Sequence, residues 1–222
     1  MIQLKAVNKK YKRENMEQEV LKNIDLIIEE GDFITIMGPS GGGKSTLLYI
    51  LSLLETSSTG EIYFDNKVVS GNKEKEIEVL RRKNIGLIFQ NSNLITGLTP
   101  LENLLLAMDS KEGKKEKIVK CEALLKKVGL LDKRNAKVTS LSGGEAQRVA
   151  VVRALVNSPR FILCDEPTGA LDSENGKRVI ELLMRVKAES GCCLAIVTHD
   201  ERIGSLGERK FFLEDGVLNE LA

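Results

Sequence analysis

The sequence contains a single histidine, His199, and its four cysteines form no Cys-x-x-Cys pair. Zinc sites in proteins are built from cysteine and histidine ligands at short, characteristic spacings, and no such arrangement occurs here. The cysteines at 121, 164, 192 and 193 fit a reduced, cytoplasmic setting best. We therefore expect neither a zinc-binding module nor a protein stabilised by disulfides.

The chain also lacks an excess of charge of either sign. Its 33 Lys and Arg residues against 32 Asp and Glu residues give a formal net charge of +1 over 222 residues. No global field attracts nucleic acid or an anionic membrane. The basic stretches at 9–14 and 111–120 are short or mixed with acidic residues, so we interpret them as solvated faces and expect no nucleic-acid partner.

Long apolar runs are absent as well. The longest apolar segment, residues 47–54, is far shorter than the roughly 18 residues that a membrane-spanning helix needs. The first fifteen residues show no apolar stretch of the kind found in a signal peptide. We expect a cytoplasmic protein that reaches a membrane only through a partner.

What the sequence does contain is a repeated alternation of strand and helix patterns. Its length and its 42% hydrophobic residues allow one sizeable core, or one core with a helical insertion. Runs rich in Ile, Val and Phe predict strands at 24–28, 33–37, 85–89, 161–165 and 194–199. Helical patterns occur at 44–54, 114–129, 143–157 and 173–189. Since several strands are apolar on both faces, we predict an α/β fold, with a helical subdomain between residues 91 and 158.

The most specific motif is "GPSGGGKST", residues 38–46. Gly38, four residues, and then Gly43, Lys44 and Ser45 follow a predicted strand and precede a predicted helix, which is the context of a P-loop. Glycines let successive amides close around phosphate oxygens, and the helix start adds a partial positive charge. We expect Lys44 to reach the β- and γ-phosphates of a nucleotide and Ser45 to coordinate Mg²⁺.

A second motif, "FILCDEP", ends a predicted strand with Asp165 and Glu166. A parallel strand beside the P-loop strand would bring Asp165 to the metal and leave Glu166 facing the attacking water. Glu166 is then the candidate general base. Without the P-loop, the same pattern would be equally consistent with an ordinary polar strand end.

The third motif, "LSGGE" at 141–145, begins a predicted helix with two adjacent glycines. Ser142 and Glu145 have the spacing of a capping box, in which each side chain satisfies a backbone amide at the helix start. Capping leaves Gly143 and Gly144 unexplained, because glycine costs a helix about 1 kcal/mol relative to alanine.

Together these motifs resemble those of the ATP-binding-cassette ATPases, the nucleotide-binding subunits of ABC transporters, over nearly the whole chain. Residues 38–46 are similar to Walker A and "FILCDE" to Walker B, while "LSGGE" is similar to the diagnostic ABC signature. "GALD" at 169–172 resembles the D-loop and "VTHD" at 197–200 the switch-histidine segment. The resemblance implies one domain, residues 1–222, with a RecA-like P-loop core at about 1–90 and 159–222, an N-terminal antiparallel β subdomain and a helical subdomain at about 91–158.

The resemblance also implies a composite ATP site between two copies that meet head to tail. One copy would bind ATP through its P-loop and an aromatic ring under the adenine: Tyr11, Gly38, Pro39, Ser40, Gly41, Gly42, Gly43, Lys44, Ser45 and Thr46. The other copy would close over the γ-phosphate with its signature and contact the first through its D-loop: Ser142, Gly143, Gly144 and Glu145, and Gly169, Ala170, Leu171 and Asp172. Bare glycine amides at a helix start suit an anion.

The remaining implied roles belong to residues at strand ends. His199 would hydrogen-bond the γ-phosphate or the attacking water, and Gln90 would sense the metal and the partner. The implied Mg²⁺ ligands are Ser45, Gln90 and Asp165. A lone histidine at a strand end and an aromatic residue in an early loop, such as Tyr11, are otherwise commonly structural.

Glu145 departs from the commonest signature of the family, which ends in glutamine. This glutamate, "LTPLEN" and "DEPTGALD" are similar to the branch that contains lipoprotein-releasing and macrolide-exporting transporters. The resemblance implies an ATPase on the inner face of the cell membrane that drives a permease for lipoprotein, macrolide or peptide-like substrates. The permease would contact residues 91–108, although Leu98, Leu101, Leu104 and Leu105 also have the spacing of a helix packed on a core.

Two alternatives use the same P-loop. A soluble ABC-type protein of translation or DNA repair usually carries two cassettes in one chain, or long coiled-coil or zinc-binding inserts, and this sequence has neither. A small-molecule kinase has no use for "LSGGE" or "GALD", and no distinct arginine-rich lid is present.

Overall fold

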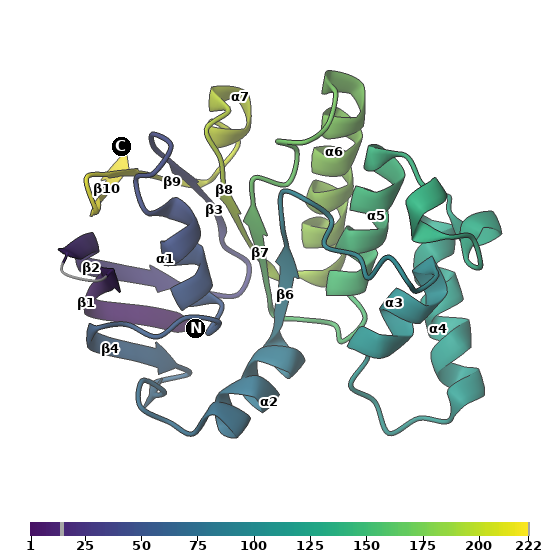
Figure 1. Cartoon of the computed structure of the whole chain (residues 1–222), viewed down its shortest axis with the longest axis horizontal. Coiled ribbons are helices and arrows are strands. Elements are labelled where there is room, and N and C mark those ends of the chain that lie inside the picture. Colours follow the sequence, from purple (N-terminus) through teal and green to yellow (C-terminus); the bar gives the residue numbers. More distant parts are fainter. Residues whose placement is uncertain (14–15, 222) are drawn as a thin grey trace. The chain divides into compact units, whose positions relative to one another are not determined.

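A computed structural model describes residues 1–13 and 16–221, so Glu14, at the end of the basic stretch 9–14, lies outside the described residues. The chain divides into two units (Figure 1). Unit 1 comprises Met1–Arg81, Leu163–Asp165 and Cys193–Ala222. Unit 2 comprises Arg82–Ile162 and Glu166–Cys192. The P-loop sequence therefore belongs to unit 1 and the signature sequence to unit 2.

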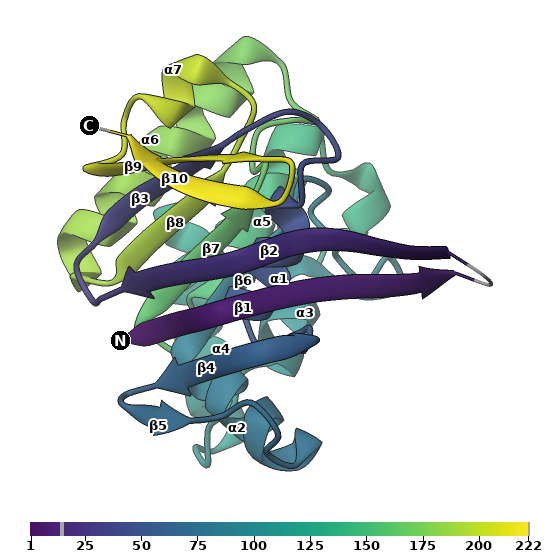
Figure 2. The ribbon, with the colours of Figure 1, turned by 90° about the vertical axis from the view of Figure 1, so that its left-hand side faces the viewer.

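Unit 1 begins with an antiparallel sheet of strand order β2-β1-β4-β5 (Figure 2). The bounds of its strands are β1 (Ile2–Arg13), β2 (Met16–Ile28), β4 (Thr59–Phe64) and β5 (Lys67–Val68). Along β2, Ile24, Leu26 and Ile28 are buried at every second position, so this face packs on the core. The antiparallel subdomain implied by the family resemblance is therefore present.

The second sheet of unit 1 has the strand order β10-β9-β3-β8-β7. Its strands are β3 (Phe33–Met37), β7 (Phe161–Asp165), β8 (Cys193–Val197), β9 (Arg209–Glu214) and β10 (Val217–Leu221), of which β7 contributes its last three residues to this unit. Strand β3 runs parallel to β8 and β9, whereas β10 is antiparallel to β9. Every residue of β8 is buried, which confirms the prediction of a sheet covered on both faces.

Two helices of unit 1 follow strands of this sheet. Helix α1 (Lys44–Leu51) follows β3, and the short α7 (Glu201–Gly204) follows β8. The predicted helix at 44–54 ends earlier, at Leu51, because Leu53 adopts a positive φ of 58°. The predicted strand at 194–199 ends at Val197, which leaves His199 in the turn before α7.

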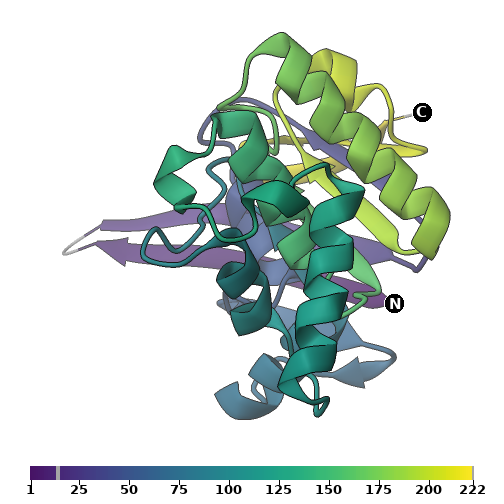
Figure 3. The same cartoon turned by 90° about the vertical axis from the view of Figure 1, so that its right-hand side faces the viewer.

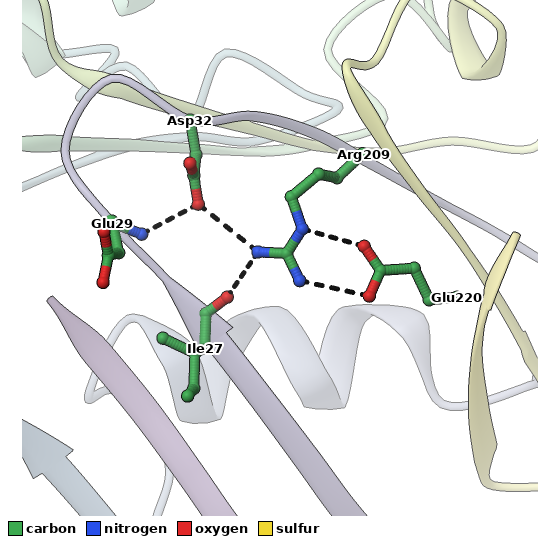
Figure 4. A network of polar contacts seen from close by, with 5 residues as sticks. All are labelled: Ile27, Glu29, Asp32, Arg209 and Glu220. Carbon is green, nitrogen blue, oxygen red and sulfur yellow. Dashed lines mark hydrogen bonds and ion pairs between the residues drawn. The ribbon is translucent and has the colours of Figure 1, made fainter. Parts of the chain in front are cut away.

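Arg209 fixes the final strand of unit 1 to its neighbours (Figure 4). Its Nε and Nη2 donate to the two carboxylate oxygens of Glu220 on β10 at 2.8 and 3.2 Å. Its Nη1 donates to the Ile27 carbonyl oxygen at 2.8 Å and to Asp32 at 3.5 Å. The bidentate guanidinium holds the pKa of the Glu220 carboxyl below its usual range, so the pair stays charged at neutral pH.

Unit 2 is mainly helical (Figure 3). Its helices are α3 (Pro100–Ala107), α4 (Lys114–Lys127), α5 (Gly143–Ala154) and α6 (Ser173–Ser190), with short 3-10 turns η1 (Leu131–Lys133) and η2 (Val138–Ser140). Strand β6 (Ile85–Ile88) lies next to β7 in the strand order, and Phe161 and Ile162 of β7 belong to this unit. Helix α2 (Glu74–Asn84) contributes residues to both units.

A separate apolar core holds α3, α4 and α5 together. It is built from Leu94, Leu104, Met108, Cys121, Leu125, Val128, Leu130, Val138, Val149, Ala150 and Val152. Leu101 and Leu105 pack against it, which confirms the expected packing of these two leucines and Leu104, whereas Leu98 precedes the helix. Among the described residues, no helix has both the length and the apolar character to cross a membrane.

The end of α4 is marked by a glycine in the sequence. Gly129 adopts a φ of 70° just beyond α4 and is the expected stop signal. Helix α2 was not predicted, because only three of its eleven residues are apolar and none of its residues is buried.

Candidate functional site

In unit 1 the P-loop sequence forms a tight turn between β3 and α1. A Cβ at Gly38, whose φ is 152°, would lie 2.0 Å from the Leu213 carbonyl oxygen. A Cβ at Gly43, whose φ is 95°, would lie 2.9 Å from the Val20 carbonyl oxygen. Only glycine fits these two positions. Gly43 is also the N-cap of α1 and supplies no side-chain cap, so the first amides of α1 remain suited to an anion.

Lys44 lies across this loop. Its side chain is buried, and its Nζ donates to the carbonyl oxygens of Gly38 and Pro39, each at 2.9 Å. Two of the three ammonium donors are thus engaged by the loop, which holds the positive charge beside the start of α1. Pro39, Ser40 and Gly41 lie at the loop tip, where Ser40 and Gly41 are exposed. The loop therefore presents backbone and one fixed cation, as a phosphate site requires.

The hydroxyl of Ser45 meets the carboxylate of Asp165, as expected. The expected adjacency of their strands was wrong, because β8 lies between β3 and β7. Ser45 Oγ donates to Asp165 Oδ1 at 3.0 Å, and the Tyr49 hydroxyl donates to Asp165 Oδ2 at 3.2 Å. Burial, followed by the charge and hydrogen bond of Asp165, raises the pKa of Tyr49, so its hydroxyl stays a donor. Tyr49 was missed, although it stands four residues after Ser45 and so shares its face of α1.

The Ser45–Asp165 pair fits a magnesium ion. Mg²⁺ in nucleotide sites takes oxygen ligands, usually one or two from carboxylates together with phosphate oxygens and water. Here a hydroxyl oxygen and a carboxylate oxygen lie 3.0 Å apart at the start of α1. Gln90, the third predicted ligand, belongs to unit 2.

Tyr11 lies on β1 with a partly exposed ring. The Lys9 ammonium lies 4.9 Å from the centroid of this ring. Lys9 is only 7% exposed, and its Nζ donates to Glu55 Oε1 at 2.7 Å and to the Thr56 carbonyl oxygen at 2.8 Å. A cation held in this way attracts the aromatic ring and fixes its orientation. Lys9 was not predicted from the sequence, because its partners lie more than 40 residues away.

His199 is exposed in the turn that follows β8. Hydrogen bonds made by the residues before and after His199 hold the turn in place. Thr198 Oγ1 accepts the Asp200 amide at 3.0 Å, and Asp200 caps α7 by accepting the Arg202 amide at 2.9 Å. His199 is thus presented at the carboxyl end of a parallel strand, where ligands of α/β sheets bind.

In unit 2 the side chains of Gln90 and Glu166 converge on Gly169. A Cβ at Gly169 would lie 2.8 Å from Gln90 Nε2 and 3.2 Å from Glu166 Oε2. The Gly169 amide donates to the Glu166 carbonyl oxygen at 3.0 Å. Glu166 has a φ of 45°, a conformation that costs a non-glycine residue about 1–3 kcal/mol and that clusters at functional sites. The structure therefore brings together three of the predicted site residues.

The start of α5 is a capping box, as predicted. Ser142 Oγ accepts the Glu145 amide at 3.3 Å, and the Ser142 amide donates to Glu145 Oε2 at 2.9 Å. Lys133 Nζ, which was not predicted, donates to the other carboxylate oxygen of Glu145 at 2.5 Å. The hydrogen bond from Lys133, followed by that from Ser142, lowers the pKa of Glu145. Glu145 therefore starts the helix as a charged carboxylate.

The two glycines of the signature differ in what surrounds them. Gly144 is buried, and a Cβ there would lie 2.4 Å from Asn175 Oδ1. Asn175 cannot move away easily, because Asp172 accepts both its amide, at 2.9 Å, and its Nδ2, at 2.7 Å. Gly143 is exposed, and a Cβ there would meet only Leu171, at 3.5 Å. Packing within the chain thus explains why position 144 requires a glycine, and it does not explain the glycine at position 143.

Gln147 on α5 is a further residue that was not predicted from the sequence. It is buried, and its Nε2 donates to the carbonyl oxygens of Phe89, at 2.8 Å, and Pro167, at 2.9 Å. The sequence signal that could have identified Gln147 is its position, because a polar residue stands there in the buried stripe of α5, between Gly144 and Val151.

Replacing Glu145 by glutamine is expected to keep the helix start and to lose only the ion pair with Lys133. A glutamine oxygen still accepts the Ser142 amide, so the capping box survives. The pair is partly exposed, so the free energy of unfolding should fall by about 1 kcal/mol or less. Urea denaturation measures this change. Lys133→Met added to the Glu145→Gln variant should cost nothing further, and a loss of several kcal/mol would contradict this account.

Comparisons with known proteins cover most or all of the chain. Residues 21–169 match the family described as "ABC transporter". The uncharacterized ABC transporter ATP-binding protein MJ0796 of Methanocaldococcus jannaschii is 44% identical over 97% of this chain and 94% of its own length. The lipoprotein-releasing system ATP-binding protein LolD of Aquifex aeolicus is 44% identical over 89% of this chain and 88% of its own length.

A further relative is much longer than this chain. The macrolide export ATP-binding/permease protein MacB of Bdellovibrio bacteriovorus is 42% identical over 98% of this chain, which matches only 33% of that protein. Among solved structures, the dimeric post-hydrolysis state of the ATP-binding cassette MJ0796 bound to ADP and Pi has a TM-score of 0.90 at 40% identity. That comparison covers 100% of this chain and 99% of the other.

Proposed function

The chain belongs to the ABC transporter ATP-binding family, and we propose that it is the subunit that binds and hydrolyses ATP to power a membrane permease. The observation that carries the proposal is the exposed Gly143 at the start of α5. Among the described residues a Cβ at Gly143 would meet only Leu171, at an ordinary contact distance, so packing does not require a glycine there. Its amide lies at a capped helix start that suits a phosphate. A second copy of the chain would supply that phosphate on bound ATP.

Dimers of a related cassette support a site shared between two copies. The solved structures of the MJ0796 cassette are dimeric, and one holds ADP and Pi. In the head-to-tail arrangement that we infer, each ATP is bound by the P-loop and Tyr11 of one copy. Ser142 and Gly143 of the other copy close over its γ-phosphate. ATP binding then stabilises the closed dimer and hydrolysis reopens it.

The residues of one copy divide the chemistry between them. Lys44 and the amides at the start of α1 neutralise and orient the phosphates. Ser45, Asp165 and Gln90 would hold Mg²⁺, which would neutralise negative charge on the phosphates. Glu166 takes the proton of the attacking water as general base, and His199 hydrogen-bonds the γ-phosphate or that water.

The permease would dock on residues 91–108. Leu104 of this segment is buried in the unit 2 core, whereas Ile95 and Leu106 are 49% and 65% exposed. One face of the segment therefore packs in the core, while the apolar side chains of Ile95 and Leu106 remain exposed and could contact a partner. The relatives named for lipoprotein release and macrolide export suggest a lipoprotein, macrolide or peptide-like substrate. The subunit would then lie on the inner face of the cell membrane.

ATP turnover by the purified chain should rise more steeply than linearly with protein concentration while the dimer is sparsely populated. Lys44→Ala should lose ATP affinity in calorimetry, because it removes the fixed cation of the P-loop. Phosphate release over a range of protein concentrations measures the first effect. A strictly linear response from a demonstrated monomer would contradict the composite site. Unchanged ATP binding by Lys44→Ala would contradict the role of Lys44 in the P-loop.

Purification of the tagged chain from native membranes distinguishes the possible roles of its ATPase. Co-purification of an integral membrane protein that stimulates ATP turnover supports the transporter subunit. Ribosomes or DNA in the same fraction would instead support the soluble ABC-type protein, and a phosphorylated small molecule would support a kinase.

A further inference from the structure

Gln147 of α5 is an amide side chain buried within unit 2, being 1% exposed. Its Nε2 donates to the carbonyl oxygens of Phe89 and Pro167 at 2.8 and 2.9 Å. A primary amide has two N–H donors, so both are used. The two carbonyls come from segments almost 80 residues apart in sequence, and a single nitrogen atom of α5 therefore sets the distance between them.

Both carbonyls flank residues with a proposed role in hydrolysis. Phe89 is the residue before Gln90, and Pro167 is the residue after Glu166. Glu166 has a φ of 45°, and strained backbone of this kind persists only where its surroundings hold it. The bonds from Gln147 to the Pro167 carbonyl and from the Gly169 amide to the Glu166 carbonyl, at 2.9 and 3.0 Å, hold the backbone that directly follows the Glu166 Cα.

The space between Gln90 and Glu166 tolerates little movement. The Cα of Gly169 fits between their side chains only because it carries no Cβ, which would lie 2.8 Å from Gln90 Nε2 and 3.2 Å from Glu166 Oε2. A small shift of either backbone segment would change this contact. Gln147 is the side chain that ties both backbone segments to α5.

We propose that Gln147 is a positioning residue for ATP hydrolysis, which holds Gln90 and Glu166 at a fixed spacing through the Phe89 and Pro167 carbonyls. The proposal rests on the ATPase function proposed above. Gln147 touches neither ATP nor water in this role and acts through the two backbone segments. Because α5 is a continuous helix that begins at Gly143, the pair is held by the same rigid element that presents the signature.

Gln147→Met tests the proposal, since methionine has a similar length and no N–H donor. Turnover at saturating ATP is expected to fall by about 10–100-fold, because misplacement of a catalytic group by about 1 Å can cost that much. ATP affinity, measured by calorimetry, should stay within about twofold, since the P-loop belongs to unit 1. Gln147→Asn retains an amide that reaches only one carbonyl, and it should give an intermediate rate with a smaller loss of stability.

Asn157 provides a matched control. Its Nδ2 also donates to two backbone carbonyls, those of Arg82 and Ala107, at 3.1 and 2.9 Å, and neither flanks a residue with a proposed role in ATP binding or hydrolysis. Asn157→Leu should lower the melting temperature about as much as Gln147→Met and leave turnover of the folded protein unchanged. Equal losses of turnover in the two variants would assign Gln147 a general structural role and overturn the proposal.

A double-mutant cycle separates positioning from packing. In the Glu166→Gln background, Gln147→Met should have little further effect on the residual turnover, because the residue that it positions is already inactive. Fully multiplicative effects would overturn the proposal, as would wild-type turnover in Gln147→Met. If the wild-type protein itself fails to hydrolyse ATP, the proposed function is wrong and this inference falls with it.

Discussion

Glu166→Gln is expected to bind ATP with unchanged affinity and to lose about 10²–10⁴-fold in steady-state turnover, the usual contribution of a positioned general base. Glutamine has almost the same volume and adopts the same backbone conformation, so the contact with Gly169 should persist. Its amide cannot accept a proton from water at neutral pH. Binding should survive because Lys44 and Ser45 lie on unit 1, in contacts that do not include Glu166.

Phosphate release and calorimetry of the same preparation measure these two quantities. Glu174→Gln is the matched control, since Glu174 is an exposed carboxylate of the same unit, on α6, where it pairs with Arg178. That variant should keep full turnover. Full turnover in Glu166→Gln would remove Glu166 as the general base and leave the P-loop assignment standing.

Gly143→Asp is expected to abolish ATP-dependent dimerisation and to lower turnover by more than about 100-fold, since like charges brought together at an interface cost several kcal/mol. The chain itself should fold normally. A Cβ at Gly143 meets only Leu171 at an ordinary contact distance, and an acidic residue in the first turn of a helix is favourable. Gly144 is unsuitable for this test, because any side chain there meets Asn175.

Light scattering and phosphate release measure dimerisation and turnover in this variant. Gly113→Asp places the same charge at the start of α4, where no atom of the described residues lies within 4 Å of the added Cβ, and it should leave both properties unchanged. ATP binding to the Gly143→Asp monomer should also be unchanged. A loss of monomer binding would show that residue 143 acts on the nucleotide of its own chain.

Mixing two inactive variants tests the head-to-tail geometry directly. A dimer of one Lys44→Ala copy and one Gly143→Asp copy contains one site with an intact P-loop and an intact signature, and a second site with neither. Turnover should therefore recover partly in the mixture. No recovery, with the mixed dimer demonstrated, would contradict a site shared between copies.

The parts of the site that were predictable from sequence are local. The P-loop needs a strand, a glycine-rich turn and a helix start within consecutive residues, so its chemistry is visible from residue types and spacing. The capping box of Ser142 and Glu145 spans four residues and was predicted for the same reason. Strands with continuous apolar runs, such as β7 and β8, were also identified, whereas the individual strands β1, β4, β9 and β10 and the exposed helix α2 were not.

Contacts between distant segments were not predictable in this way. Lys9 meets Glu55, and Gln147 meets Phe89 and Pro167, across separations of 20 to 58 residues. In the sequence, residue type alone does not distinguish Lys9 or Gln147 from other polar residues. Only burial and the position of its partners give each side chain its role.

The adjacent glycines of the signature, Gly143 and Gly144, also combine a local property that was predictable with distant contacts that were not. The sequence by itself determined that a helix begins there with bare backbone, because the capping spacing and the cost of glycine are local properties. Only the tertiary structure decided that Gly144 makes room for Asn175 on α6 and that Gly143 faces outward. The physical reason is that a missing side chain has meaning only in relation to what would occupy its space, and that neighbour comes from elsewhere in the fold.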